Sequence, residues 1–294
     1  MSISEVPAAL HNAPGTGSPL TLLRQAFTEI SSRRRLVRYL VQADMKKRGT
    51  DTLLGNLWWI LDPLLQMVVY VIFVTIIARS SIKDYPLFIF AAILPWKWFS
   101  AAVTDSTGAI VRQERLIRQI AFPKIVLPVA TVTAGTVGFA WGLIPLAAIM
   151  LVYHDRLSLM VLWIPVIAAV QYVFTLAAAI LVSAANVFFR DLGNVAGHVL
   201  RLWWFLSPGL YSLTALDQVH FIRDHPILRQ LAGANPFAIL FESYRTVIYG
   251  TDSGGPPTTP NLVGLLELLI GSLVLLAICA IVFKRLEPDF AKVL

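Results

Sequence analysis

A series of long apolar segments constrains this chain more than any other feature of its sequence. A transmembrane helix needs about 20 consecutive, mostly apolar residues, within a range of about 17 to 25. Six segments qualify: residues 53–78, 85–104, 125–153, 157–189, 192–216 and 261–283. They predict an all-α, polytopic membrane protein with six transmembrane helices. His198, Arg201 and Pro208 interrupt the fifth segment, so a re-entrant or broken helix is the alternative there.

The composition excludes a soluble domain. Apolar residues make up 57% of the chain and charged residues 14%, against about 45–50% and about 25% in globular proteins. The net charge is +7, but the basic residues lie between the apolar segments, which argues against a nucleic-acid-binding face. The single cysteine, Cys279, excludes a disulfide framework or a thiolate metal site within one chain.

The distribution of basic residues predicts the orientation in the membrane. Most of the 24 Lys and Arg residues precede residue 53 or lie at 105–124, at 190–201 and at the C-terminus. By the positive-inside rule, both termini are cytoplasmic. Residues 1–20 carry no basic start followed by an apolar stretch, so we expect a flexible tail over residues 1–30 and no cleavable signal.

Residues 31–52 separate that tail from the first apolar segment. Leu36 and Leu40 lie on one face of a helix, and basic residues from Arg33 to Arg48 flank them. This pattern predicts an amphipathic helix that lies in the membrane interface. The alternative is a basic cluster that only sets the topology.

A short basic helix is expected on the cytoplasmic side, at about residues 108–121. Its basic side carries Arg112, Arg115 and Arg118, and its apolar side carries Leu116, Ile117 and Ile120, before Phe122 and Pro123 end it. An exposed apolar edge of this kind favours a docking site for another protein. A helix that lies on the membrane surface is the alternative.

The long connection at 217–260 is expected on the outer side. Asn235 followed by Pro236 is typical of a helix N-terminus, and an apolar stripe follows it. The sequence therefore predicts a second amphipathic helix at the outer surface, with the stripe made by Phe237, Leu240, Phe241, Tyr244 and Ile248.

No catalytic motif is present. The sequence contains no GxSxG, no HExxH, no paired metal ligands and no Gly-Lys dipeptide, and therefore no Walker A loop. An enzyme is not expected, and neither is a metal site or a cofactor in this chain. If transport is driven by ATP, another chain must bind the nucleotide.

One charge and several aromatic residues lie deep in the apolar segments. Lys97 is halfway along its segment, in the sequence PWKWF, and indicates a polar cavity or a subunit interface. Aromatic rings can offer sliding sugar rings a stacking surface, and contact with lipid is an equally good explanation. The deep aromatic residues are Trp96, Trp98, Phe99, Trp203 and Trp204.

Five blocks of sequence together resemble the ABC-2 type permeases of polysaccharide, O-antigen and teichoic acid exporters. The blocks are ADMKKRGTDTLLGNLWWILDPLLQMVVYVIF, RQERLIRQIAFPKIVLPVA, NVFFRDLGNVAGHVLRLWWFLSPGLYS, NPFAILFESYRTVIYG and FKRLEPDFAKVL. They occur in the family's order and spacing, and the similarity covers residues 36 to 294. Lys97 departs from the family, in which we expect an uncharged residue beside the Pro-Trp pair.

The resemblance implies a six-span permease over residues 53–294 in the bacterial cytoplasmic membrane, forming a homodimer with two separate ATPase subunits that bind ATP and Mg²⁺. It implies that the helix around Arg112–Gln119 couples to the ATPase, that residues 235–249 contribute to an outer gate, and that the substrate is a lipid-linked glycan such as O antigen, capsule, teichoic acid or galactan. The channel residues it favours are Tyr70, Phe73, Trp96, Trp98 and Phe99, to which Lys97, Trp203 and Trp204 are added as candidates.

Two other functions remain open. One is an ABC-2 permease that exports a small hydrophobic compound or a lipid. The other is a membrane scaffold, or an intramembrane enzyme that acts on glycans.

Overall fold

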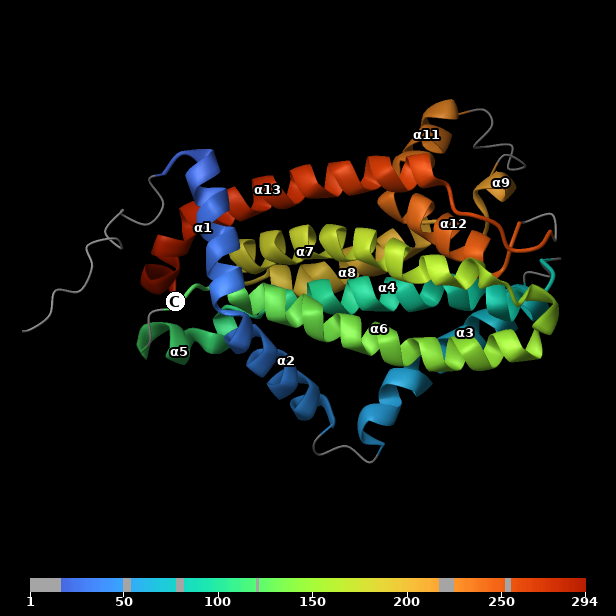
Figure 1. Ribbon diagram of the computed structural model, residues 1–294, viewed down its shortest axis with the longest axis horizontal. Helices are drawn as coiled ribbons and strands as arrows, with labels where there is room; N and C mark the ends of the chain where they lie inside the picture. Colours follow the sequence, from blue (N-terminus) through green and yellow to red (C-terminus); the bar gives the residue numbers. More distant parts are fainter. Residues whose placement is uncertain (1–16, 50–53, 78–81, 120–121, 217–224, 252–254) are drawn as a thin grey trace, which may run out of the picture.

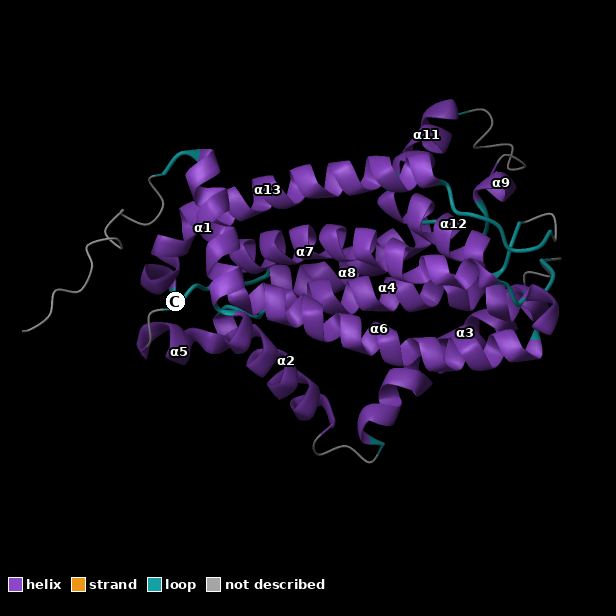
Figure 2. Cartoon of the chain, in the orientation of Figure 1, coloured by secondary structure: helices purple, strands orange, loops and turns teal. Residues whose placement is uncertain are grey.

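The computed structural model describes residues 17–49, 54–77, 82–119, 122–216, 225–251 and 255–294. Within these ranges the chain forms helices joined by loops, and no strand is present (Figure 2). The all-α prediction is therefore confirmed for the described residues. The α-helices are α1 (Pro19–Ser32), α2 (Arg34–Gly49), α3 (Trp58–Val71), α4 (Tyr85–Thr107), α5 (Glu114–Gln119), α6 (Val126–Val152), α7 (Ile164–Phe188), α8 (Leu192–Leu206), α9 (Leu213–Leu216), α11 (Pro226–Ala234), α12 (Pro236–Ile248) and α13 (Leu262–Val293).

Five stretches of helix among the described residues are long and apolar enough to cross a membrane. They are Trp58–Ile77, in which a π-helix (Ile72–Ile77) extends α3, and Tyr85–Thr107, Val126–Val152, Leu159–Phe188 and Leu262–Phe290. Each coincides with one of the six predicted segments. The protein is thus a multi-pass membrane protein.

The fifth predicted segment, residues 192–216, is not one continuous helix. Its 15-residue helix α8 is about 22 Å long at 1.5 Å per residue, short of the hydrocarbon thickness of about 30 Å. The helix ends where Ser207 is extended, with ψ 149°, and Pro208 follows without a backbone N–H. The broken-helix alternative is correct, and the six-span layout is not reproduced as six long helices.

The helices run side by side around α4 (Figure 1). Most residues of α4 are buried, because α3, α6, α7, α8 and α12 pack around it. By contrast, α3 leaves Leu65, Val69 and Ile76 exposed along the length of its span. An apolar face of this kind suits contact with lipid or with another membrane chain.

The two ends of the bundle differ. Figure 1 shows α1, α5 and the C-terminus at one end and α9, α11 and α12 at the other. Within the range 1–30 expected as a flexible tail, the chain is helical from Pro19 on, where α1 begins. The Ser18 side chain caps α1, and Leu22 and Ala26 are buried. Residues 1–16 lie outside the described residues.

Helix α2 falls within the range 31–52 predicted for an interfacial helix. It packs against α6, with Leu36 and Leu40 partly buried and Arg35 and Arg38 exposed. An amphipathic helix is therefore present there, and its position in the membrane interface stays a prediction.

Candidate functional site

An aromatic cluster joins α4, α8 and α12 in the core. The Trp96 ring on α4 lies 4.8 Å from Phe237 and 5.5 Å from Trp204, between ring centroids. The Phe99 ring lies 4.7 Å from Phe237 and 5.5 Å from Trp203. Such edge-to-face and tilted contacts each add about 0.5–1.5 kcal/mol beyond the area they bury. The structure thus brings four predicted channel residues together with a predicted gate residue.

These rings fill the space between their helices within a single chain. Trp96, Phe99, Trp204 and Phe237 are each at most 5% exposed. Tyr70 reaches the cluster from α3, stacked on Trp204 at 5.8 Å. A path along these rings therefore requires α8 or α12 to move away from α4.

Two predicted channel residues lie apart from this cluster. Phe73 is 50% exposed on the outward face of the π-helix. Trp98 points to the other side of α4, where its ring lies 4.9 Å from Phe139 on α6. Trp96 and Phe99, which are three positions apart, thus lie on one side of α4, and Trp98 lies on another, because residues i and i+3 share a face of a helix.

Asn235 caps α12 and ties it to α8. Its Oδ1 accepts hydrogen bonds from the backbone N–H of Phe237 at 3.0 Å and from Nε1 of Trp203 at 3.2 Å. Its Nδ2 donates to Oγ of Ser207 at 2.8 Å. Pro236 takes the first helical position. The predicted helix start is therefore confirmed.

This helix packs into the bundle, and its expected position at the outer side of the membrane stays a prediction. The α12 stripe made by Phe237, Leu240, Phe241 and Tyr244 is buried, and it packs against α4, α7 and α13. An apolar stripe indicates that one face is covered, and here other helices of the same chain cover it. Residues 217–224 and 252–254 of the predicted gate region lie outside the described residues.

Sequence reasoning missed the part played by Arg245 on α12. Its Nη1 donates to the backbone carbonyls of Pro208 at 2.7 Å and Tyr211 at 3.1 Å, and its Nη2 donates to that of Gly209. The guanidinium also stacks on the Phe88 ring at 3.7 Å. Irregular backbone is tolerated at membrane depth only where protein groups satisfy it. Arg245 supplies these donors to the turn that follows α8, and an arginine within an apolar stripe was the signal in the sequence.

Lys97 lines a cavity between α3, α4 and α6. A polar cavity was one of the two surroundings expected for this charge. Its Nζ forms an ion pair with the Asp62 carboxylate on α3. The cavity has a volume of about 330 Å³, and Trp98 and Phe139 are among its lining residues. The Lys97 charge is thus matched by a carboxylate 35 positions earlier in the chain.

The predicted partner-docking segment forms a 3₁₀ turn (Val111–Gln113) followed by α5. Arg112 and Arg115 are exposed, but Ile117 is only 7% exposed and belongs to a buried apolar cluster with Phe290. The expected apolar edge is therefore not free at Ile117, because this side chain packs into that cluster.

The structure describes only some of the other residues predicted for this docking segment. Phe122 and Pro123 are partly buried. The side chains of Leu116 and Arg118, and the whole of Ile120, lie outside the described residues.

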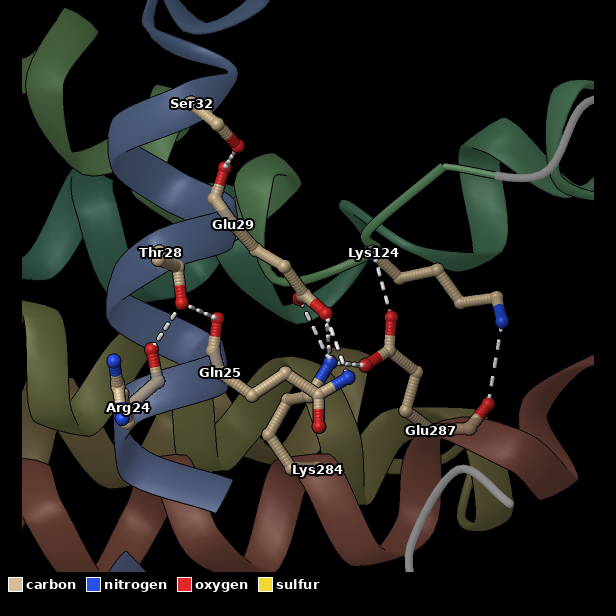
Figure 3. Close-up of polar contacts among 8 residues, drawn as sticks. All are labelled: Arg24, Gln25, Thr28, Glu29, Ser32, Lys124, Lys284 and Glu287. Carbon is tan, nitrogen blue, oxygen red and sulfur yellow. Dashed lines mark hydrogen bonds and ion pairs between the residues drawn. The ribbon is translucent and has the colours of Figure 1, made fainter. Parts of the chain in front are cut away.

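A charge network at the α5 end joins α1, α13 and Lys124, which lies just before α6 (Figure 3). Lys284 Nζ lies 2.7 Å from Glu29 Oε2 and 2.5 Å from Glu287 Oε2. Glu287 Oε1 accepts the backbone N–H of Lys124 at 2.7 Å. Because Lys124 follows Pro123 directly, this network links the segment after α5 to α13.

The fold and these sites define a multi-pass membrane protein in which the segment 192–216 is an interrupted helix. Comparison with known proteins identifies its family. No family model matches the chain. It is 32% identical to the O-antigen export system permease protein RfbA of Myxococcus xanthus over 264 residues, which are 90% of this chain and 97% of that protein. It is 27% identical to the protein of the same name from Klebsiella pneumoniae over 256 residues, 87% of this chain and 93% of that protein. The chain belongs to the family of O-antigen export permeases, which are ABC-2 type permeases.

Proposed function

We propose that this chain is the permease subunit of an ATP-driven ABC exporter that moves a lipid-linked polysaccharide across the bacterial cytoplasmic membrane. The observation that carries the proposal is the match to an O-antigen export permease over nearly the full length of both chains. O antigen, capsule, teichoic acid and galactan are all compatible with this assignment. The absence of catalytic motifs from the sequence supports a transporter rather than an enzyme.

The functional assembly in this proposal holds two copies of the chain and two ATPase subunits that bind ATP and Mg²⁺. The exposed apolar face of α3, with Leu65, Val69 and Ile76, supports contact with a second copy. Arg112 and Arg115 are exposed beside α5, which supports docking of the ATPase at that end of the bundle. Both termini are then cytoplasmic, because α1 and the C-terminus lie at the α5 end (Figure 1).

The sixth crossing in this proposal is made by α8 together with the turn and α9 that follow it. Phe188, at the end of α7, contacts Phe290 near the C-terminus, whereas the start of α13 packs near α12 at the opposite end. The chain must therefore cross once more between α7 and α13. Because the helix is interrupted between α8 and α9, we expect this crossing to rearrange more easily than the continuous helices.

The transport cycle then uses two states of the bundle. Nucleotide binding by the partner shifts α5, and the contact between Lys124 and Glu287 carries that movement to α13. Helix α13 packs against α12 at its other end. Separation of α12 and α8 from α4 opens the aromatic cluster, whose rings offer sugar rings sliding contacts. A ligand shifts such an equilibrium only by favouring one state.

Two experiments test the proposal. The first deletes the gene for this chain in its host, and the second purifies the tagged chain together with the proteins that bind it. We expect loss of the surface polysaccharide, accumulation of lipid-linked polymer inside the cell, and a co-purifying ATPase. Charge reversal in Arg115→Glu lowers ATPase recovery several-fold, while Lys292→Glu, an exposed change at the same end, does not. Unchanged surface polysaccharide together with export of a labelled amphiphile would support the small-molecule alternative instead.

A further inference from the structure

The cavity between α3, α4 and α6 is separate from the aromatic cluster. Lys97 and Trp98 line it, whereas Trp96 and Phe99 on the same helix belong to the cluster with α8 and α12. Its volume of about 330 Å³ lies in the range of small-molecule pockets, about 300–1,000 Å³. It therefore has room for one small ring, apart from the path proposed for export.

The charged groups of this cavity are accessible to a ligand, and one buried donor lies beside them. Asp62 and Lys97 form an ion pair, yet the Asp62 side chain is 62% exposed and the Lys97 side chain 26%. Trp98 is only 4% exposed, and its Nε1 has no hydrogen-bond partner among the described residues. A buried donor without a partner costs about 1–3 kcal/mol. A ligand with a hydroxyl group at this position would remove that cost.

Aromatic rings form much of the remaining wall. Trp58, Trp59, Trp98 and Phe139 line the cavity. The Trp59 ring rests directly on α6, because a Cβ at Gly138 would lie 1.6 Å from its Cζ3. Gly138 thus allows the indole to approach the helix backbone closely. The cavity combines indole faces with a carboxylate, an ammonium group and an N–H donor.

We propose that this cavity binds an uncharged sugar ring at the head of a membrane lipid. The aromatic faces suit the C–H faces of a sugar, and Asp62, Lys97 and the Trp98 N–H suit its hydroxyl groups. A hydrocarbon chain would leave these polar groups unsatisfied, and a bare phosphate would meet the Asp62 carboxylate. The role of this site in export, as a second contact for the lipid-linked glycan, rests on the proposed function, whereas the binding itself does not.

The experiment uses the full chain, purified without glycosidic detergent and reconstituted in phosphatidylcholine nanodiscs. The probe is an alkyl glucoside with a diazirine on the alkyl carbon next to the sugar. The matched probe carries a phosphocholine head on the same chain. We expect the glucoside to label peptides that contain residues 55–63, 94–105 and 131–139, with at least a five-fold excess over the phosphocholine probe. Equal labelling by the two probes would overturn the proposal.

Single substitutions then test the cavity. Trp98→Phe keeps most of the ring and removes its N–H, and Asp62→Asn removes the carboxylate charge at a largely exposed side chain. We expect each to lower glucoside labelling at least three-fold. Trp141→Phe, the same ring change at an exposed position on α6, leaves it unchanged. Labelling that survives both cavity variants overturns the proposal, and Asp62→Asn decides the matter if Trp98→Phe does not fold.

The sugar could come from a carrier-linked glycan or from a membrane glycolipid, and competition experiments distinguish the two. Either result supports the sugar site. Displacement by a polyprenyl-phosphate glucose assigns it to carrier-linked glycans, and displacement by glucosyl diacylglycerol alone assigns it to membrane glycolipids. The labelling result and the export result test different proposals. Labelling without polysaccharide export leaves the sugar site standing, and export without labelling removes only the sugar site.

Discussion

Asn235 and Trp203 connect α12 to α8, since Oδ1 of Asn235 accepts a hydrogen bond of 3.2 Å from Nε1 of Trp203. The same oxygen caps α12 through the backbone N–H of Phe237. One amide side chain therefore fixes where α12 begins and where the end of α8 lies against it.

Replacement of Asn235 by alanine should destabilise the protein more than loss of an ordinary helix cap. An N-cap is worth about 1 kcal/mol, and the variant also leaves the Trp203 N–H and the Ser207 hydroxyl without this partner. We expect a fall of several degrees in the melting temperature in detergent. The matched control is Asn261→Ala, which removes the cap of α13, a bond of 3.0 Å to Gly264. Equal falls for the two variants would mean that the bridge to α8 contributes nothing.

Arg245 should be more important for stability than an exposed arginine. In Arg245→Met the carbonyls of Pro208 and Tyr211 lose this donor, and each unsatisfied buried group costs about 1–3 kcal/mol. Arg245→Lys should recover only part of the loss, because an ammonium group lacks the planar fork that reaches several carbonyls. Thermal unfolding of both variants beside Arg24→Met, at an exposed position on α1, tests this. A melting temperature for Arg245→Met equal to that of Arg24→Met would contradict it.

The predicted channel aromatics should separate into two groups on mutation. Trp96 is 5% exposed, and removal of such a buried ring typically costs about 3–5 kcal/mol. Phe73 is half exposed on the π-helix that extends α3, so Phe73→Ala should cost far less in a single chain. Detergent-solubilised yield and melting temperature of Trp96→Ala and Phe73→Ala measure the difference. If the two variants lose stability equally, Phe73 is covered by another chain in the assembly.

The spans and the start of α12 could be predicted because their signals are local. A long apolar run or an Asn-Pro pair carries its meaning within a few residues. The Lys97–Asp62 pair and the contacts of Arg245 join residues that are distant in the chain, and no local pattern specifies the partner. The burial of Ile117 was missed for a related reason, since an apolar face shows that something covers it and not what does.

The charge network at the α5 end provides the sharpest test of long-range packing. Lys284 is 5% exposed in its side chain and lies between Glu29 and Glu287. Lys284→Met leaves two carboxylates without this cation, and breaking a buried pair typically costs about 3–5 kcal/mol. The triple variant Lys284→Met, Glu29→Gln, Glu287→Gln should recover much of that loss, because no buried charge then remains unpaired.

Lys292→Met breaks the exposed pair with Asp289 and should cost less than about 1 kcal/mol. Thermal unfolding of the three variants decides the point, and a triple variant no more stable than Lys284→Met would show that the lysine acts through its packing and not through its charge.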